Sequence, residues 1–140
     1  MAILPQTITA SATLKRHVHQ GAVVNLSAAA GLTVTLPAST GKGDVYKIFV
    51  VTTVTSNAYV IQVANATDIM AGVLGLSTDI SGSNMLTAAT TDTISMNGST
   101  TGGLKGSYVV LEDVAAGVWR ISGDLITTGT ETSPFSAAVS

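Results

Sequence analysis

Residues 31–50 read GLTVTLPASTGKGDVYKIFV. Apolar and polar residues alternate strictly from Leu32 to Leu36, which is the pattern of a strand with one buried and one exposed face. Pro37 ends this run, and the small polar residues that follow it are typical of a turn or loop. A second run, rich in β-branched and aromatic residues, begins at Val45 and predicts another strand. The stretch therefore predicts two strands joined by a Gly-rich loop.

The loop TGKGD at residues 40–44 has two glycines around a lysine, as phosphate-binding loops do. Such a loop leads into the N-terminus of a helix, and a Ser or Thr after the lysine helps to hold a metal ion. Here Gly43 follows Lys42, and the next segment is strand-like. We therefore interpret TGKGD as a connection between strands and not as a nucleotide site.

Other segments have the same strand-like character, being short, rich in β-branched or aromatic residues and bounded by Gly, Asn, Ser or Pro. They are residues 58–64, 92–96, 107–114 and 118–126. Two stretches have some helical character, residues 25–31 and 66–76, but Gly72 and Gly75 interrupt the second at about 1 kcal/mol each. We interpret both as loops or single turns, so the sequence predicts an all-β fold.

The composition limits the class of protein. A chain of 140 residues is expected to form one domain. Only 10% of its residues are charged and the net charge is -2, so the basic stripe of a nucleic-acid-binding protein is missing. Small uncharged residues replace the charges, and they lose water at a lower cost than Lys or Glu. This favours a surface that contacts other protein molecules.

Targeting and redox signals are equally sparse. The chain has no cysteine, so neither a disulfide nor a thiolate metal site is expected. No apolar run approaches the roughly 20 residues of a membrane helix. The opening residues, MAILPQTITA, lack the basic region of a signal peptide. We expect no membrane segment and no secretion signal.

No catalytic or metal-binding constellation stands out. His17 and His19 would share one face of a strand, but two ligands are too few for a metal site. Glu112 and Asp113 are adjacent, so a strand would point them to opposite faces and keep them from acting as a pair. None of the serines lies in a nucleophile-elbow motif. We expect no enzymatic activity, no metal and no cofactor.

The two termini differ from the central part of the chain. Residues 1–16 contain Pro5 and no strong amphipathic pattern, which predicts an extended N-terminal arm. Residues 129–140 are polar with Phe135 as their only large apolar side chain, which predicts a C-terminal tail. Both segments are expected to be ordered by a neighbouring molecule, with ordinary fraying as the alternative. Residues 17–128 between them form the predicted β domain.

Residues 31–72, GLTVTLPASTGKGDVYKIFVVTTVTSNAYVIQVANATDIMAG, resemble a segment of small structural proteins of tailed bacteriophages. The shared pattern is an alternating strand that ends in Leu-Pro, a small-residue loop with Gly-x-Gly, an aromatic strand and then TSNAYVIQVA. The C-terminal TTGTETSPFSAAVS is also similar to these proteins. Within this group the chain most resembles the capsid decoration, or cement, proteins.

The resemblance implies a compact β-barrel, β-tulip or jelly-roll-like domain with an extended N-terminal arm. It also implies homotrimers on the outer capsid surface of the virion, after assembly in the bacterial host cytoplasm. The partner would be the phage major capsid protein, whose subunits the chain would bridge and stabilise. The resemblance implies neither enzymatic activity nor a cofactor.

An extended arm binds a partner by adding a strand to an exposed sheet edge, and backbone hydrogen bonds then supply the affinity. We expect the N-terminal segment to bind the capsid in this way, and the basic cluster LKRHVH at residues 14–19 to meet an acidic patch on the partner. Removal of residues 2–14 is then expected to leave a folded domain that no longer binds. The predicted partner-binding residues are Ile3, Leu4, Pro5, Thr7, Ile8, Thr9, Leu14, Lys15, Arg16 and His17.

Two other functions remain open. One is a trimeric head-fibre or tail-spike component that contacts host glycans. The other is a carbohydrate-binding β-sandwich outside any virus, which would need exposed aromatic rings as sugar platforms. The chain has a single tryptophan, Trp119, and its strand-like surroundings predict a position in the core.

Overall fold

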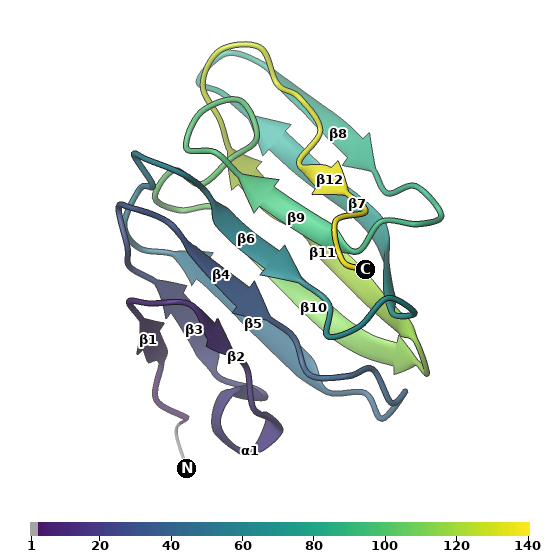
Figure 1. Cartoon of the computed structure of the whole chain (residues 1–140). Coiled ribbons are helices and arrows are strands. Elements are labelled where there is room, and N and C mark those ends of the chain that lie inside the picture. The colour runs from purple at the N-terminus through teal and green to yellow at the C-terminus, as the bar shows by residue number, and fades with distance from the viewer. Residues whose placement is uncertain (1–2) are drawn as a thin grey trace.

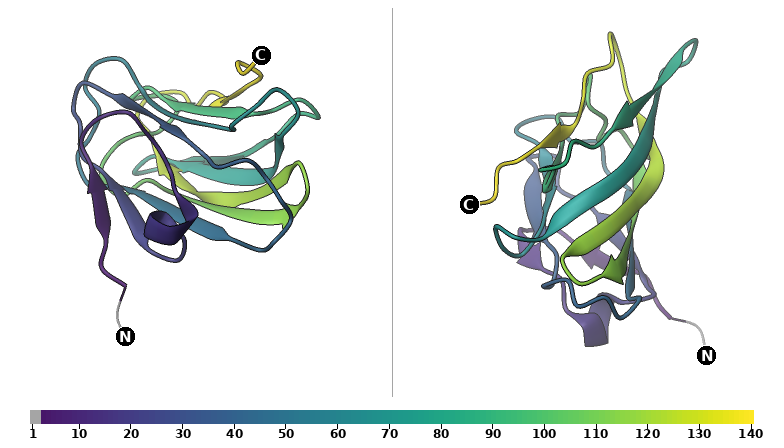
Figure 2. Two further views of the ribbon diagram at one scale, coloured as in Figure 1. Left: turned by 60° about the horizontal axis from the view of Figure 1, so that its bottom comes forward. Right: turned by 90° about the vertical axis from the view of Figure 1, so that its right-hand side faces the viewer.

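The computed structural model describes residues 3–140, and these residues form two β-sheets that face one another (Figures 1 and 2). The predicted all-β class is therefore confirmed. The strands of the described residues belong to two separate sheets, so they form a sandwich and not a closed barrel. No helix among residues 3–140 is long and apolar enough to cross a membrane.

The two sheets differ in size. In spatial order the large sheet contains β1 (Gln6–Ile8), β3 (Val23–Leu26), β5 (Val45–Val50), β10 (Tyr108–Ala115), β11 (Val118–Ile126), β7 (Ile69–Ser77) and β8 (Gly82–Leu86). The small sheet contains β12 (Phe135–Ser136), β9 (Thr93–Met96), β6 (Tyr59–Gln62), β4 (Leu32–Thr35) and β2 (Ala12–Thr13). A single helical turn, α1 (Arg16–His19), precedes β3.

The first six strands alternate between the two sheets. β1, β3 and β5 run parallel in the large sheet, while β2, β4 and β6 run parallel in the small sheet. Parallel neighbours need a crossover connection, which is usually a helix. Here each crossover contains a strand of the opposite sheet, so the chain passes back and forth between the two sheets. Most later pairings are antiparallel, with β11 and β7 as a parallel exception.

The stretch at residues 31–50 forms the two predicted strands, β4 and β5. Leu32 and Val34 point into the core, whereas Thr33 and Thr35 point outward, as the alternation predicts. The two strands do not pair with each other. β4 lies between β2 and β6, and β5 lies between β3 and β10. The TGKGD loop therefore crosses from one sheet to the other at one end of the sandwich.

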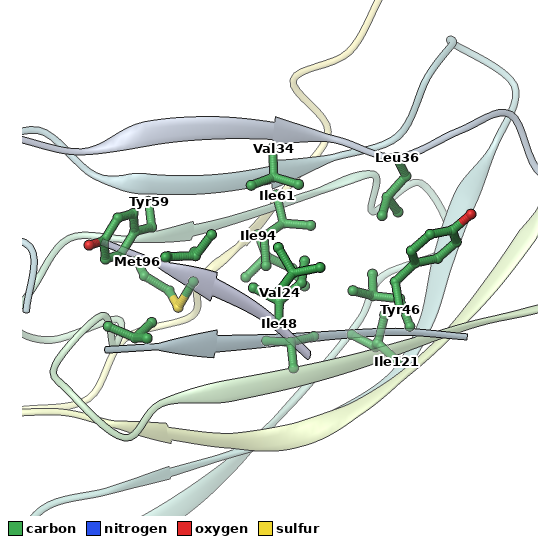
Figure 3. Close-up of a cluster of buried hydrophobic side chains, with 14 of the residues drawn as sticks. Val24, Val34, Leu36, Tyr46, Ile48, Tyr59, Ile61, Ile94, Met96 and Ile121 are labelled. Atoms are coloured by element: carbon green, nitrogen blue, oxygen red, sulfur yellow. The ribbon is translucent and has the colours of Figure 1, made fainter. Parts of the chain in front are cut away.

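The core lies between the sheets, and Figure 3 shows side chains from both sheets pointing toward one another. At one end the rings of Tyr46 and Trp119 meet edge to face, with centroids 5.8 Å apart. At the other end the Tyr59 hydroxyl donates to the Thr52 carbonyl at 2.6 Å and accepts the Ala28 N–H at 2.9 Å. Trp119 is thus a core residue, as predicted.

One predicted loop is wrong, because residues 69–77 form the long strand β7. Gly72 and Gly75 argue against a helix, but in this strand they make room for β11. A Cβ on Gly72 would collide with the Ile121 carbonyl, and a Cβ on Gly75 would collide with the carboxylate of Asp124. Gly72 therefore marks a close approach between two strand backbones, whereas Gly75 leaves space for a side chain.

The N-terminal segment is part of both sheets, in contrast to the predicted extended arm. Thr7 of β1 pairs with Asn25, and Ala12 of β2 pairs with Val34. Leu14 is only 2% exposed and lies in the core. Its N–H donates to the Thr35 carbonyl at 2.8 Å. Residues 6–14 are therefore ordered by their own domain, and their backbone edges are already used in part.

The C-terminal segment is also held by the domain itself. β12 pairs antiparallel with β9, and Phe135 packs against the core as its apolar anchor. The Ala138 N–H donates to the Asp92 carboxylate at 2.9 Å. The predicted tail therefore extends the edge of the small sheet.

Candidate interaction surface

The TGKGD loop does surround an anion, but the anion belongs to the chain itself. The backbone N–H groups of Thr40 and Gly41 donate to the two carboxylate oxygens of Asp113, each at 2.8 Å. The hydroxyl of Ser39 donates to the same carboxylate at 2.7 Å. Asp113 lies on β10, where it is buried, while its neighbour Glu112 points to the other face. The loop is therefore fastened to the large sheet.

The electrostatics of this contact keep Asp113 ionised. Burial raises the pKa of the Asp113 carboxyl, but the hydrogen bonds from Ser39, Thr40 and Gly41 outweigh burial and lower the pKa below its ordinary value. The carboxylate thus satisfies the donors that a phosphate would need. This arrangement supports a structural role for the loop.

Two further buried aspartates hold loops in the same manner. Asp68 accepts the Ser39 N–H at 2.8 Å, so Ser39 is held by two carboxylates. Asp92 accepts the Thr93 hydroxyl at 2.7 Å and the backbone of the C-terminal segment. All three aspartates are engaged by donors from segments of the domain, and they serve as attachments for its loops.

The histidines lie on the helical turn α1, so they do not share one face of a strand. His17 is exposed, whereas the ring of His19 folds back so that Nδ1 accepts the Lys15 N–H at 2.9 Å. Arg16 forms an ion pair with Asp44, with 2.9 Å between Nε and Oδ2. Among residues 3–140, no group of three or more His, Asp or Glu side chains is placed to hold a metal ion.

The predicted partner-binding residues fall into three environments. One is buried, and the prediction for Leu14 is wrong because a core side chain cannot meet a partner. One is half-buried, since Ile8 packs against the core. The others are exposed and lie before β1, around it or on α1, and they are Ile3, Leu4, Pro5, Thr7, Thr9, Lys15, Arg16 and His17.

The outer face of the large sheet carries apolar side chains that the sequence analysis did not identify as a site. Phe49 on β5 lies opposite Tyr108 on β10, and Lys47 lies between Val23 and Val110 in the next row. Together they line a shallow depression of ≈ 260 Å³. We call these five residues the outer patch.

Polar groups border the outer patch on the side of β11. The Tyr108 hydroxyl donates to Oδ2 of Asp124 at 3.0 Å, and this hydrogen bond raises the pKa of Tyr108. Arg120 and Glu112 form an ion pair at 2.8 Å across β10 and β11. Lys47 is the one charged residue within the patch itself. The surface is therefore apolar at its centre and polar at its border.

The alternation of inward and outward side chains along β5 could have indicated part of the outer patch. In VYKIFV, Tyr46 and Ile48 point inward, so Lys47 and Phe49 must point outward. An outward Phe beside an outward Tyr marks an interaction surface only when both strands are known to be neighbours. That pairing joins residues far apart in the chain, and no local pattern reveals it.

Comparisons of this chain with family models, with curated proteins and with solved structures find no match. Its function is therefore argued from the outer patch, from the N-terminal segment and from the resemblance of residues 31–72.

Proposed function

We propose that this chain is a structural protein of a tailed-phage virion that binds the outer surface of the capsid. In this role it bridges neighbouring subunits of the major capsid protein and stabilises the shell. The resemblance of residues 31–72 to decoration proteins supports the viral class. The observation that carries the binding role is the outer patch, where two aromatic side chains and two valines lie side by side on the outer face of the large sheet.

The chemistry of the outer patch suits a protein surface. Aromatic side chains are enriched at interfaces, and a few central anchors supply most of the binding energy. Phe49 and Tyr108 are adjacent and can fill such a role. Lys47 adds a single positive charge, which fits an acidic side chain of the partner and fixes the orientation of binding.

The segment before β1 offers further exposed apolar side chains for the proposed binding. Ile3 and Leu4 are 61% and 73% exposed. The Ile3 side chain lies against Gly21, with 3.5 Å between its Cδ1 and the position of a Cβ on that glycine. Gly21 is two residues before Val23 of the outer patch. Ile3, Leu4 and Pro5 therefore stay in the proposed binding surface, but through their side chains and not through strand addition by β1 and β2.

The proposed role requires no chemical reaction. The three buried aspartates are occupied by backbone and hydroxyl donors of the domain. Their arrangement supports a rigid scaffold, which is what a protein that bridges capsid subunits needs.

Co-sedimentation with capsids of the phage that encodes this chain tests the proposal. Val110→Lys places a charge in the outer patch, and we expect capsid occupancy to fall by about tenfold or more because the charge loses its water on binding. The matched control is Val60→Lys, since Val60 is also half-buried but points outward from the small sheet. Equal occupancy for Val110→Lys and the unmodified chain would contradict the proposal.

A second role has one observation in its favour. Tyr108 lies beside Phe49 and shares a hydrogen bond with Asp124, and aromatic rings next to a carboxylate also suit a sugar. This favours a head-fibre or tail-spike component that binds host glycans. Asp124→Asn would weaken binding to a host polysaccharide in that case, whereas capsid binding would change little. Binding of the chain to polysaccharide but not to capsids would replace the first role with this one.

A further inference from the structure

β8 is the open edge of the large sheet, at the opposite end from β1 (Figure 1). Four of its five residues are exposed, and Met85 is half-buried. Leu86 is 74% exposed, and Ile80 in the turn before β8 is 95% exposed. The strand thus combines a free backbone edge with apolar side chains in solvent.

The hydrogen-bond pattern shows which backbone groups of β8 are free. The N–H of Thr87 donates to the Gly72 carbonyl at 3.1 Å, and the N–H of Thr78 donates to the Ser81 carbonyl at 2.8 Å. Antiparallel ladders alternate between hydrogen-bonded and non-hydrogen-bonded pairs. The N–H and C=O groups of Ser83 and Met85 therefore face β7. Those of Gly82, Asn84 and Leu86 face the open edge.

Proteins commonly protect such an edge with a charged residue, a proline or a bulge. β8 has the sequence GSNML and contains neither a charge nor a proline. Its register with β7 is regular from Gly82 to Leu86, so no bulge interrupts it. An unprotected edge of this kind is a template for another strand.

We propose that β8 pairs antiparallel with β8 of a second copy of this chain, about a twofold axis at Asn84. In this register Asn84 lies opposite itself, and Gly82 lies opposite Leu86 of the second copy. Each of the three residues whose backbone groups face the open edge then lies opposite such a residue of the second copy. Each of these pairs exchanges two backbone hydrogen bonds, which satisfies the groups that the single chain leaves free.

The side chains fit the same register. Leu86 of one copy lies across from Gly82 of the other, which has no side chain to obstruct it. Beyond Gly82 in the same row lie Ser77 and then Ile126, both on the outer face of the sheet. Leu86 can therefore lie over the backbone of Gly82, which removes part of its apolar surface from water. Burial of exposed apolar surface adds to the backbone hydrogen bonds.

The absence of charge points to a second copy and not to a different partner. A twofold axis at Asn84 places this residue against its own copy, so a charge there would repel itself. Asn84 avoids this conflict because its side-chain amide has both donors and acceptors. A self-complementary, uncharged strand is what this symmetry requires.

The dimer would present two outer patches on one side. When two β8 strands pair antiparallel about this axis, the axis is perpendicular to the joined sheet. The outer faces of the two copies then lie on the same side of it, and both outer patches point the same way. Two patches on one surface bind with a gain in avidity. This consequence rests on the proposed function, whereas the pairing of β8 does not.

Sedimentation velocity of the full chain over a range of concentrations, without capsids, tests the pairing. We expect the 14.1 kDa chain to reach a dimer. Asn84→Lys places two like charges at the axis, so its dimer dissociates at least about tenfold more readily. Ala66→Lys is the matched control, because it adds the same charge to an exposed loop and leaves the dimer unchanged. Circular dichroism confirms that both variants are folded.

Amide hydrogen exchange provides a second readout on the unmodified protein. On dimerisation the amides of Gly82, Asn84 and Leu86 become protected, whereas those of Ser83 and Met85 change little because they already bind β7. A monomer at every concentration would overturn the proposal. So would a dimer without this alternating protection. A trimer would overturn it as well and would support the assembly that the resemblance implies.

Discussion

The backbone N–H of Gly41 donates to Oδ1 of Asp113 at 2.8 Å, although the two residues are 72 positions apart in the chain. The contact joins the loop between β4 and β5 to β10, and so it ties the first half of the fold to the second. A Gly-rich loop that resembles a phosphate-binding loop is thus closed by a carboxylate of its own domain. Its donors are satisfied inside the protein, which makes this end of the sandwich rigid.

Substitution of Asp113 is expected to destabilise the domain. Asp113→Asn leaves an amide NH₂ group facing N–H donors of the loop, and we expect a loss of about 2–3 kcal/mol in the free energy of unfolding. Urea denaturation at neutral pH measures it. Asp79→Asn is the control, because Asp79 lies exposed in the turn before β8. Equal stability of the two variants would contradict the role of Asp113 in fastening the loop to the large sheet.

The same contact makes stability depend on pH. The folded-state pKa of Asp113 lies below its unfolded value of 3.8. The unfolded chain therefore binds more protons at this group than the folded chain does. The stability that the ionised Asp113 contributes is present above about pH 4 and is lost as the pH falls through the folded-state pKa. We expect the difference in Tm between the unmodified protein and Asp113→Asn to shrink in acid. A difference that stays constant from neutral pH into strong acid would rule this out.

The glycines of the loop differ in what surrounds them, although both have a positive φ, +75° for Gly41 and +81° for Gly43. A Cβ on Gly41 would lie 2.8 Å from the Ala116 nitrogen, whereas a Cβ on Gly43 would have nothing within 4 Å. Gly43→Ala is expected to cost about 1–2 kcal/mol from backbone strain alone. Gly41→Ala is expected to cost about 1–3 kcal/mol more, because backbone must move. Thermal unfolding of the pair measures the difference, and identical Tm values would contradict the crowding at Gly41.

Local patterns in the sequence predict individual strands well. Strict alternation around Val34 predicts both the strand and the face that is buried, because side chains of a strand point to opposite sides in turn. Trp119 is correctly placed in the core for the same reason. The prediction fails over β7, where Gly72 serves the close packing of two strands and carries no local signature.

Long-range pairings could not be predicted from these patterns. Nothing near Val45 indicates that β5 lies in the sheet opposite β4, since either arrangement buries the same side chains. The outer patch depends on such a pairing, between Phe49 and Tyr108. The extended-arm prediction for residues 1–16 has the same origin, because short segments such as β1 gain their order only from a parallel neighbour.

Changes in the N-terminal segment test whether it is a detachable arm or part of the two sheets. Leu14→Ala removes a fully buried side chain, so we expect a loss of about 2–5 kcal/mol in the free energy of unfolding. Leu4→Ala alters an exposed side chain and is expected to stay within about 0.5 kcal/mol of the unmodified protein. Deletion of residues 1–14 removes Leu14 together with β1 and β2, and we expect it to unfold the domain or leave it severely destabilised. Circular dichroism and urea denaturation measure all three. A stable domain after that deletion would restore the detachable arm and would show that the ladders of β1 and β2 contribute little to the fold.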